Sequence, residues 1–152
     1  MTIKWQKDLD LGIPVIDQQH QRIVDLIVDL HNAGGRGDQA LVGGVIDSLI
    51  DYTESHFAFE EALMEDAGYV FTRAHKKLHE RFIDKAKEYK YRHVAGEDVA
   101  HELSNSLTIW LFEHIRKDDR DYQGAVKEKM INLTSDANEG GWLSRSVKRF
   151  FR

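Results

Sequence analysis

Two short segments each place metal-capable side chains four residues apart: His56 with Glu60, and His75 with His79. On a helix this spacing puts both members of a pair on one face, a turn apart. The chain contains no Cys, which excludes thiolate metal sites, iron–sulfur clusters and disulfides. Any metal would therefore be held by nitrogen and oxygen. The candidate ligands are five histidines and two carboxylates: His20, His56, Glu60, His75, His79, His114 and Asp119.

The size of this ligand set indicates the kind of metal site. Seven ligands exceed the four of a closed zinc site, and they fit two octahedral ions that share carboxylates and keep one position open. Mixed histidine and carboxylate ligation points to iron or manganese, and iron suits oxygen chemistry best. The zinc-protease pattern H-E-x-x-H is absent, because residues 79–83 and 101–105 both lack its second histidine. The Glu-x-x-His pattern of ferritin-like di-iron bundles is absent as well.

Four stretches with apolar residues at alternating spacings of three and four predict amphipathic helices facing a core. They are expected to begin near Asp17, Asp38, Thr72 and Glu97, with Asp17 and Asp38 as N-caps. Segments 32–37, 67–69 and 93–96 are expected to end the first three helices. The predicted fold is all-α, an up-down-up-down four-helix bundle with an N-terminal non-helical arm and a short C-terminal amphipathic helix.

This topology sorts the eight histidines into two groups. The start of the first helix, the end of the second, the start of the third and the end of the fourth share one end of such a bundle. Those four helix ends carry the five histidines of the candidate ligand set, whereas His31, His93 and His101 fall at the opposite end. A buried cluster of imidazoles and carboxylates is costly without a compensating cation. Metal binding is therefore favoured over five separate structural histidines.

Asp119 poses a geometric problem for this arrangement. It follows His114 by five residues, which is about 140° around an ideal helix at about 100° per residue. Both side chains cannot face the core from a straight helix. The spacing therefore predicts that the fourth helix bends or ends between Lys117 and Asp119; the alternative is that Asp119 is an ordinary surface acid in a charged run.

Length and composition suit one globular unit without nucleic-acid binding. The 152 residues can bury a substantial core, and the net charge of −5 argues against nucleic acid as a partner. The N-terminus lacks a signal-peptide pattern and no apolar run approaches about 20 residues, so a cytoplasmic protein is expected. The predicted division is a di-iron bundle over 1–132, including the arm 1–16, followed by a linker and basic amphipathic helix over 133–152.

The motifs around these ligands resemble the hemerythrin family, in particular its single-domain bacterial members. The matching segments are Asp17-Gln18-Gln19-His20, His56-Phe57-x-x-Glu60-Glu61-x-x-Met64, His75-x-x-x-His79 and His114-Ile115-x-x-x-Asp119-x-x-Tyr122. All seven ligand positions of the family pattern are filled in order, over roughly residues 1–130.

The resemblance implies reversible O₂ binding at a non-haem di-iron site with oxo or hydroxo bridging. It implies that Glu60 and Asp119 bridge two irons. One iron would take His75, His79 and His114; the other would take His20 and His56 and leave an open position for O₂. The family's O₂ pocket corresponds to Phe57, Trp110, Leu111 and Ile115, for which plain core packing is the alternative.

The expected role is oxygen transport, storage or delivery to an oxygen-consuming enzyme, not catalysis. Two other roles use the same irons: an O₂ or redox sensor, and a scavenger of peroxide or nitric oxide. A slow loss of the oxygenated form would favour a carrier, and rapid conversion to ferric iron would favour the others.

The tail 142–152 has apolar and basic residues on opposite halves of a helix and carries a charge of +4. Such a helix is typical of docking to a membrane surface or to a membrane-protein partner, which would place the protein at the inner face of the membrane. The alternative is a helix packed on the bundle with its basic face in solvent.

Overall fold

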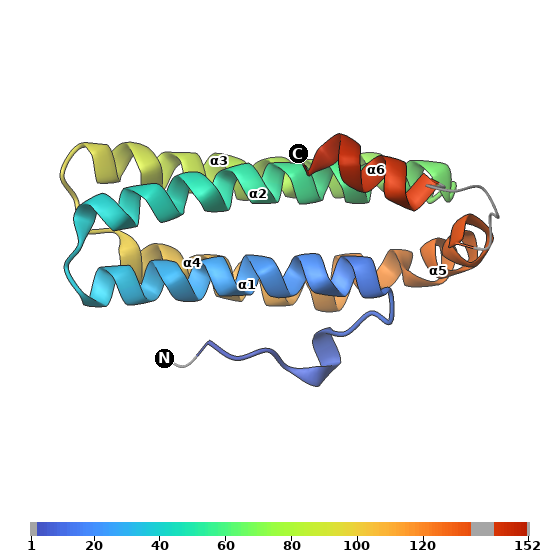
Figure 1. Cartoon of the computed structure of the whole chain (residues 1–152), viewed down its shortest axis with the longest axis horizontal. Helices are drawn as coiled ribbons and strands as arrows, with labels where there is room; N and C mark the ends of the chain where they lie inside the picture. The colour runs from blue at the N-terminus through green and yellow to red at the C-terminus, as the bar shows by residue number, and fades with distance from the viewer. Residues whose placement is uncertain (1–2, 135–141, 152) are drawn as a thin grey trace.

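Six α-helices follow one another in the computed structural model, which describes residues 3–134 and 142–151, with side chains described up to 129 and again from 145 (Figure 1). A short 3-10 turn, η1, and a π-helical turn, η2, accompany them. The elements are η1 (Lys7–Leu9), α1 (Pro14–Gly35), α2 (Gln39–Asp66), α3 (Thr72–Val94), α4 (Ala100–His114), η2 (Ile115–Asp119), α5 (Arg120–Thr134) and α6 (Trp142–Phe150).

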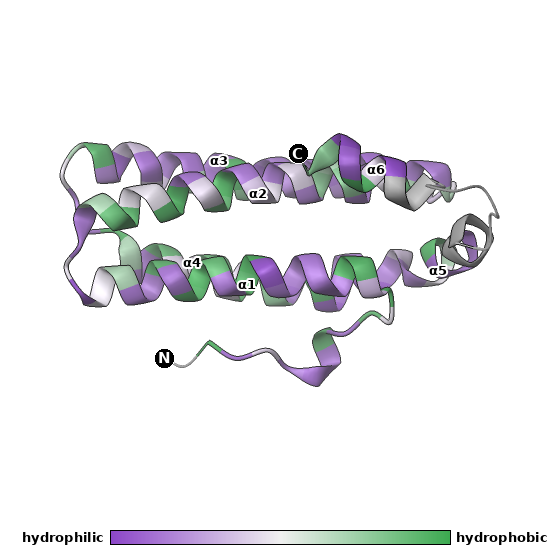
Figure 2. Ribbon diagram, viewed as in Figure 1, coloured by the Kyte–Doolittle hydropathy of each residue, from purple (hydrophilic) through white to green (hydrophobic). Residues whose placement is uncertain are grey.

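Helices α1 to α4 form the predicted up-down-up-down bundle, so the all-α prediction is confirmed (Figure 1). Apolar and polar residues alternate around each helix, and the apolar ones form one continuous core (Figure 2). Residues such as Ile23, Ile46 and Leu107 are fully buried in it. No helix in the described part of the chain is long and apolar enough to cross a membrane.

The expected start of the first helix is wrong. Helix α1 begins at Pro14, whose fixed φ and missing N–H suit the first helical position. Asp17 lies inside the helix, and its carboxylate accepts hydrogen bonds from the backbone N–H groups of Leu11 (2.9 Å) and Gly12 (3.0 Å). Gly12 has φ +76°, a conformation that favours glycine. Asp17 therefore fixes the turn that precedes the helix.

The starts of α2 and α3 agree with the prediction, and the start of α4 differs by three residues. Asp38 caps α2 as predicted, because its side chain accepts a hydrogen bond from Leu41 N–H at 3.0 Å. Helix α3 begins at Thr72 as expected. Helix α4 begins at Ala100, three residues after the expected Glu97. The Glu97 carboxylate instead pairs with Arg92 near the end of α3.

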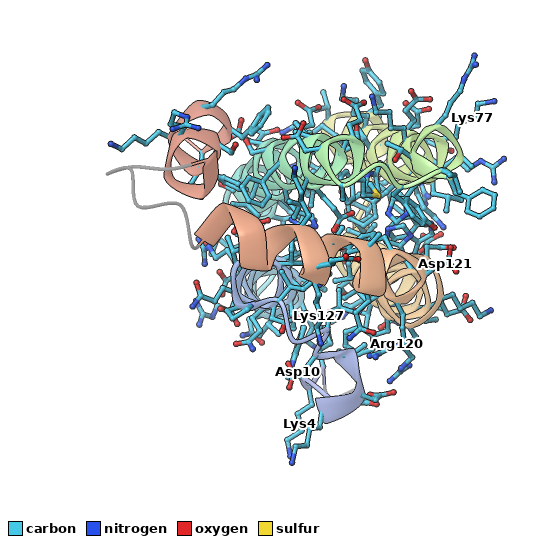
Figure 3. The ribbon with its side chains drawn as sticks, turned by 90° about the vertical axis from the view of Figure 1, so that its right-hand side faces the viewer. Lys4, Asp10, Lys77, Arg120, Asp121 and Lys127 are labelled. Atoms are coloured by element: carbon cyan, nitrogen blue, oxygen red, sulfur yellow. The ribbon has the colours of Figure 1, made fainter. Side chains whose placement is uncertain are left out.

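The chain changes direction after α4, as the spacing of His114 and Asp119 predicts. Residues Ile115–Asp119 form a π-helical turn, and the chain continues into α5 instead of ending. Helix α5 crosses the end of the bundle, turned away from the axis of α4; Arg120 and Asp121 label its start (Figure 3). A π turn is wider than an α turn, because its hydrogen bonds join residues five apart. This widening brings His114 and Asp119 onto one face.

The N-terminal arm and α6 pack on the outside of the bundle. The arm buries Leu9, Leu11 and Ile13, and Arg116 forms an ion pair with Asp8 at 2.8 Å. Helix α6 packs on α2 and α5. The predicted linker and C-terminal helix over 133–152 include residues 135–141, which lie outside the described residues, so the domain division remains a prediction.

Candidate metal centre

The seven predicted ligands meet at one end of the bundle. Helix α1 contributes His20, α2 contributes His56 and Glu60, α3 contributes His75 and His79, α4 contributes His114, and η2 contributes Asp119. Every one of these side chains is at least 97% buried. The structure therefore brings together the complete set that the sequence indicated.

Their donor atoms form two groups that share a carboxylate. The first group contains Glu60, His75, His79, His114 and Asp119, and the second contains His20, His56 and Glu60. Within each group the atoms lie within 4.8 Å of one another. Ligands on opposite sides of a transition-metal ion are about 4.0–4.4 Å apart at bond lengths of about 2.0–2.2 Å. Each group is thus compact enough to surround an ion.

Glu60 directs one oxygen toward each group of histidines. Its Oε1 is 2.9 Å from His79 Nε2 and 3.2 Å from His75 Nε2. Its Oε2 is 3.2 Å from His56 Nε2 and 3.6 Å from His20 Nε2.

The two carboxylate oxygens of Asp119 also face different groups of histidines. Its Oδ1 lies 3.0 Å from His75 Nε2 and 3.1 Å from His114 Nε2, while its Oδ2 lies 3.2 Å from His20 Nε2. Both carboxylates therefore lie between the two histidine groups.

The two carboxylates raise the proton affinity of nearby histidines. Burial alone would lower the pKa of His20 and His75, but Asp119 and Glu60 outweigh it and raise the pKa to about 9 and about 10. Burial also acts to lower the pKa of His114, which Asp119 raises to about 9. A cation that binds these rings must displace their protons, because only a neutral imidazole nitrogen can ligate.

The carboxylates themselves are held in the charged form. Burial would raise the pKa of Glu60 and Asp119, but the surrounding histidines hold the pKa of both well below its ordinary value. Burial lowers the pKa of His56, so this ring is neutral. The cluster thus offers charged oxygens and a free imidazole, which is the donor chemistry of a transition-metal site.

Several buried atoms of the cluster have no hydrogen-bond partner among the described residues. They are His20 Nδ1 and Nε2, His79 Nε2, His114 Nε2 and both Asp119 oxygens. Leaving such atoms unpaired costs free energy, and native structures rarely tolerate several together. A cation at the centre would pair with the ring nitrogens and carboxylate oxygens that face it. The residues present therefore fit a bound transition metal.

Three side chains hold the outer ring nitrogens of the histidines. His56 Nδ1 lies 2.6 Å from Gln19 Oε1, and His79 Nδ1 lies 2.7 Å from Glu61 Oε2. When Nδ1 of a histidine donates such a hydrogen bond, Nε2 of the same ring is unprotonated and can ligate a metal. The hydrogen bond also fixes the orientation of the ring. His114 follows the same pattern: its Nδ1 lies 2.9 Å from Asp118 Oδ2.

Tyr122 supports the shared carboxylate from α5. Its fully buried hydroxyl donates to Glu60 Oε2 at 2.9 Å, and burial raises the pKa of Tyr122 well above its ordinary value. The tyrosine is thus a neutral donor that fixes the orientation of Glu60.

The sequence analysis did not identify the three acceptors of the ring nitrogens. Each lies next to a ligand in the chain: Gln19 before His20, Glu61 after Glu60 and Asp118 before Asp119. The one signal available was the four-residue separation of Asp118 from His114, because residues so spaced are neighbours on a helix.

Two of the four apolar residues predicted to line an O₂ pocket contact the histidines directly. Phe57 stacks on His79 with ring centroids 3.9 Å apart, and Trp110 stacks on His114 at 4.4 Å. Leu111 and Ile115 are buried beside them in the chain. Aromatic rings from α2 and α4 thus cover two of the clustered histidines. All four side chains also belong to or pack against the continuous core, which is the packing role named as the alternative.

Comparison with known proteins agrees with this geometry. The family model described as "Hemerythrin HHE cation binding domain" matches residues 11–126. Bacteriohemerythrin of Pseudomonas aeruginosa (strain PAO1 among others) is 58% identical over 147 residues, which cover 97% of this chain and 96% of the relative. Bacteriohemerythrin of Stenotrophomonas maltophilia is 52% identical, with the same coverage.

The fold has solved counterparts as well. A crystal structure of wild-type hemerythrin superimposes with a TM-score of 0.78 at 28% identity, covering 83% of this chain and 98% of the other. The family match spans most of the chain and includes all seven clustered side chains. This chain therefore belongs to the hemerythrin family.

Proposed function

We propose that the protein binds O₂ reversibly at a non-haem di-iron site, for oxygen transport, storage or delivery. The proposed ligands are His20, His56, Glu60, His75, His79, His114 and Asp119. The observation that carries this proposal is that Glu60 and Asp119 each direct one oxygen toward each histidine group. A carboxylate so placed would hold two ions, one through each oxygen. When bound, a pair of ferrous ions supplies the electrons on which reversible O₂ binding depends.

The unequal histidine groups support an open position on one side. Three histidines, His75, His79 and His114, lie on one side of the shared carboxylates. Only His20 and His56 lie on the other. The side with two histidines has fewer protein donors, which leaves coordination space for an exogenous ligand such as O₂.

The apolar surroundings support binding without turnover. Phe57, Leu111 and Ile115 are almost completely buried, and they reduce the access of water to the histidines. A dry site limits side reactions of a bound oxidant. These side chains form the proposed O₂ pocket together with Trp110. Their proposed role is to exclude water and protons, which favours reversible binding over the scavenger alternative.

The contacts of the C-terminal segment favour a helix packed on the bundle over a helix docked to a membrane. Phe150 and Phe151 of the α6 region contact Phe59 on α2, with ring centroids 6.4 and 5.9 Å apart. Their apolar surface is thus directed onto the bundle. Binding to a membrane surface remains a prediction, and comparing liposome partitioning before and after deletion of residues 140–152 tests it. The side chains of Trp142 and Leu143 lie outside the described residues.

An optical experiment tests the proposed function. The purified protein is loaded with Fe²⁺ without oxygen, its iron content is measured, and spectra are recorded before air, in air and after removal of O₂. We expect an absorption band that appears in air and disappears on deoxygenation. His114→Ala should lose iron and this band, whereas His31→Ala, the same change at the opposite end, should retain both. Immediate irreversible oxidation of the iron-loaded protein would contradict reversible carriage.

A further inference from the structure

Two histidines outside the cluster contact each other at the opposite end of the bundle. His31 is in the last two turns of α1, and His101 is in the first turn of α4. Their Nδ1 atoms are 3.3 Å apart. The ring centroids are 4.8 Å apart, with the ring planes at 77°. His101 is exposed and His31 is half-buried, so solvent and solutes reach this pair.

A close approach of the two helices creates this contact. Gly34 lies one turn after His31, and Ala100 immediately precedes His101. A Cβ atom placed on Gly34 would be only 2.4 Å from the Cβ of Ala100. The absence of a side chain at residue 34 therefore allows α1 and α4 to approach closely here. This approach brings the two imidazoles, which project from different helices, within contact distance.

We propose that His31 and His101 form a second metal site, which binds Zn²⁺ or a similar divalent transition ion through their Nδ1 atoms. Two imidazole nitrogens on a tetrahedral ion, each at about 2.0–2.1 Å, are about 3.3–3.4 Å apart. The separation of 3.3 Å matches this value. Adjacent nitrogens on an octahedral ion at the same bond length would be about 2.8–3.0 Å apart.

The chemistry of the pair selects the class of ion. Imidazole suits Zn²⁺, Cu²⁺ and Ni²⁺, while Mg²⁺ and Ca²⁺ prefer oxygen ligands. Two protein ligands leave the remaining coordination positions to water, so this site is open and more weakly binding than the buried cluster. A single N–H···N hydrogen bond between the rings would give a similar separation. The two cases differ, because an ion requires the lone pairs of both Nδ1 atoms, whereas a hydrogen bond requires a proton on one of them.

A bound ion would join the end of α1 to the start of α4. Because it would bind the folded chain, whose helices hold the two rings together, it would raise the thermal midpoint of unfolding as its concentration rises. The site is separate from the proposed O₂ site, since the topology places the two at opposite ends of the bundle (Figure 1). Its failure would therefore leave the proposed O₂ function unaffected.

The test uses iron-loaded protein, so that the buried cluster is already filled. Zn²⁺ is added in competition with a chromophoric chelator, and iron is measured before and after to show that none is displaced. We expect one further equivalent of Zn²⁺ to bind. Both His31→Ala and His101→Ala should weaken this binding more than about tenfold. Removing only the hydrogen-bond partner of a metal ligand already lowers metal affinity about 10–100-fold, and these substitutions remove a ligand itself.

Two controls make the result decisive. His93→Ala removes another histidine from the same end of the bundle, and Zn²⁺ should bind this variant as it binds the unaltered protein. Co²⁺ added to iron-loaded protein under anaerobic conditions should show the intense visible bands of tetrahedral coordination, and His101→Ala should remove them. No additional Zn²⁺, equal binding by all variants, or loss of binding in His93→Ala would each overturn the proposal.

Discussion

The contact between Glu61 and His79 provides a graded test of how the histidines are prepared for iron. Glu61 Oε2 is 2.7 Å from His79 Nδ1, and the Glu61 side chain is 22% exposed. We expect Glu61→Gln to weaken iron binding and Glu61→Ala to weaken it further. Glutamine keeps an acceptor oxygen but removes the charge, whereas alanine removes both. The ring of His79 would then lose the partner that orients its Nε2 toward Glu60 Oε1.

The expected size follows from the strength of this hydrogen bond. Hydrogen bonds to charged groups contribute about 1.5–3 kcal/mol, and the partial exposure of Glu61 places this one toward the lower part of that range. Losing such a partner of a metal-bound histidine costs about 10–100-fold in metal affinity. We therefore expect a loss of about tenfold for glutamine and up to about 100-fold for alanine, which is about 1.4–2.7 kcal/mol.

The assay is transfer of iron from the protein to a coloured ferrous chelator under anaerobic conditions. Glu65→Ala is the matched control, because Glu65 lies one turn further along α2, is exposed, and pairs with Lys76. It should release iron as the unaltered protein does. Equal iron affinity in Glu61→Ala and the unaltered protein would refute the reasoning, as would an equal loss in Glu65→Ala.

Two further predictions concern the metal-free protein. In the folded protein the pKa is raised from an ordinary 6.5 to about 9 for His20 and His114 and to about 10 for His75. Protonation of these rings therefore stabilises the fold, fully below pH 6.5, and this stabilisation is lost as the pH rises through 9 to 10. Urea unfolding should give a free energy at least about 2 kcal/mol lower at pH 10 than at pH 7, and equal values would contradict this. Tyr122→Phe removes the donor to Glu60 and should cost about 1.5–3 kcal/mol at pH 7 by the same measurement. A change below about 0.5 kcal/mol, the level of a neutral surface substitution, would show that this hydrogen bond does not hold Glu60.

The clustering of the ligands could be predicted because two strong regularities determine it. Spacings such as His56 to Glu60 place side chains on one helical face, and the up-down order of the helices places the relevant helix ends together. Asp119 was the exception that a straight helix could not accommodate. Its spacing predicted a bend, and the π turn provides it. The continuation into α5, which supplies Tyr122, carried no comparable signal.

The partners of the ring nitrogens could not be predicted, because they depend on how adjacent helices are aligned. Gln19 reaches His56 from α1 to α2, and Glu61 reaches His79 from α2 to α3. A shift of one residue between two helices would break either contact while leaving every periodicity in the sequence unchanged. The start of α1 was missed for a different reason. Asp17 has the chemistry of an N-cap, but Pro14 had already begun the helix.

The most direct test of the central claim is the number of metal ions that the cluster holds. Apoprotein is loaded with excess Fe²⁺ without oxygen, loosely bound metal is removed by gel filtration, and iron and protein are quantified in the same fractions. Because Glu60 and Asp119 each face both histidine groups, we predict about two iron ions per chain. A value that saturates at one iron per chain would contradict a bridged pair and the O₂ chemistry inferred from it.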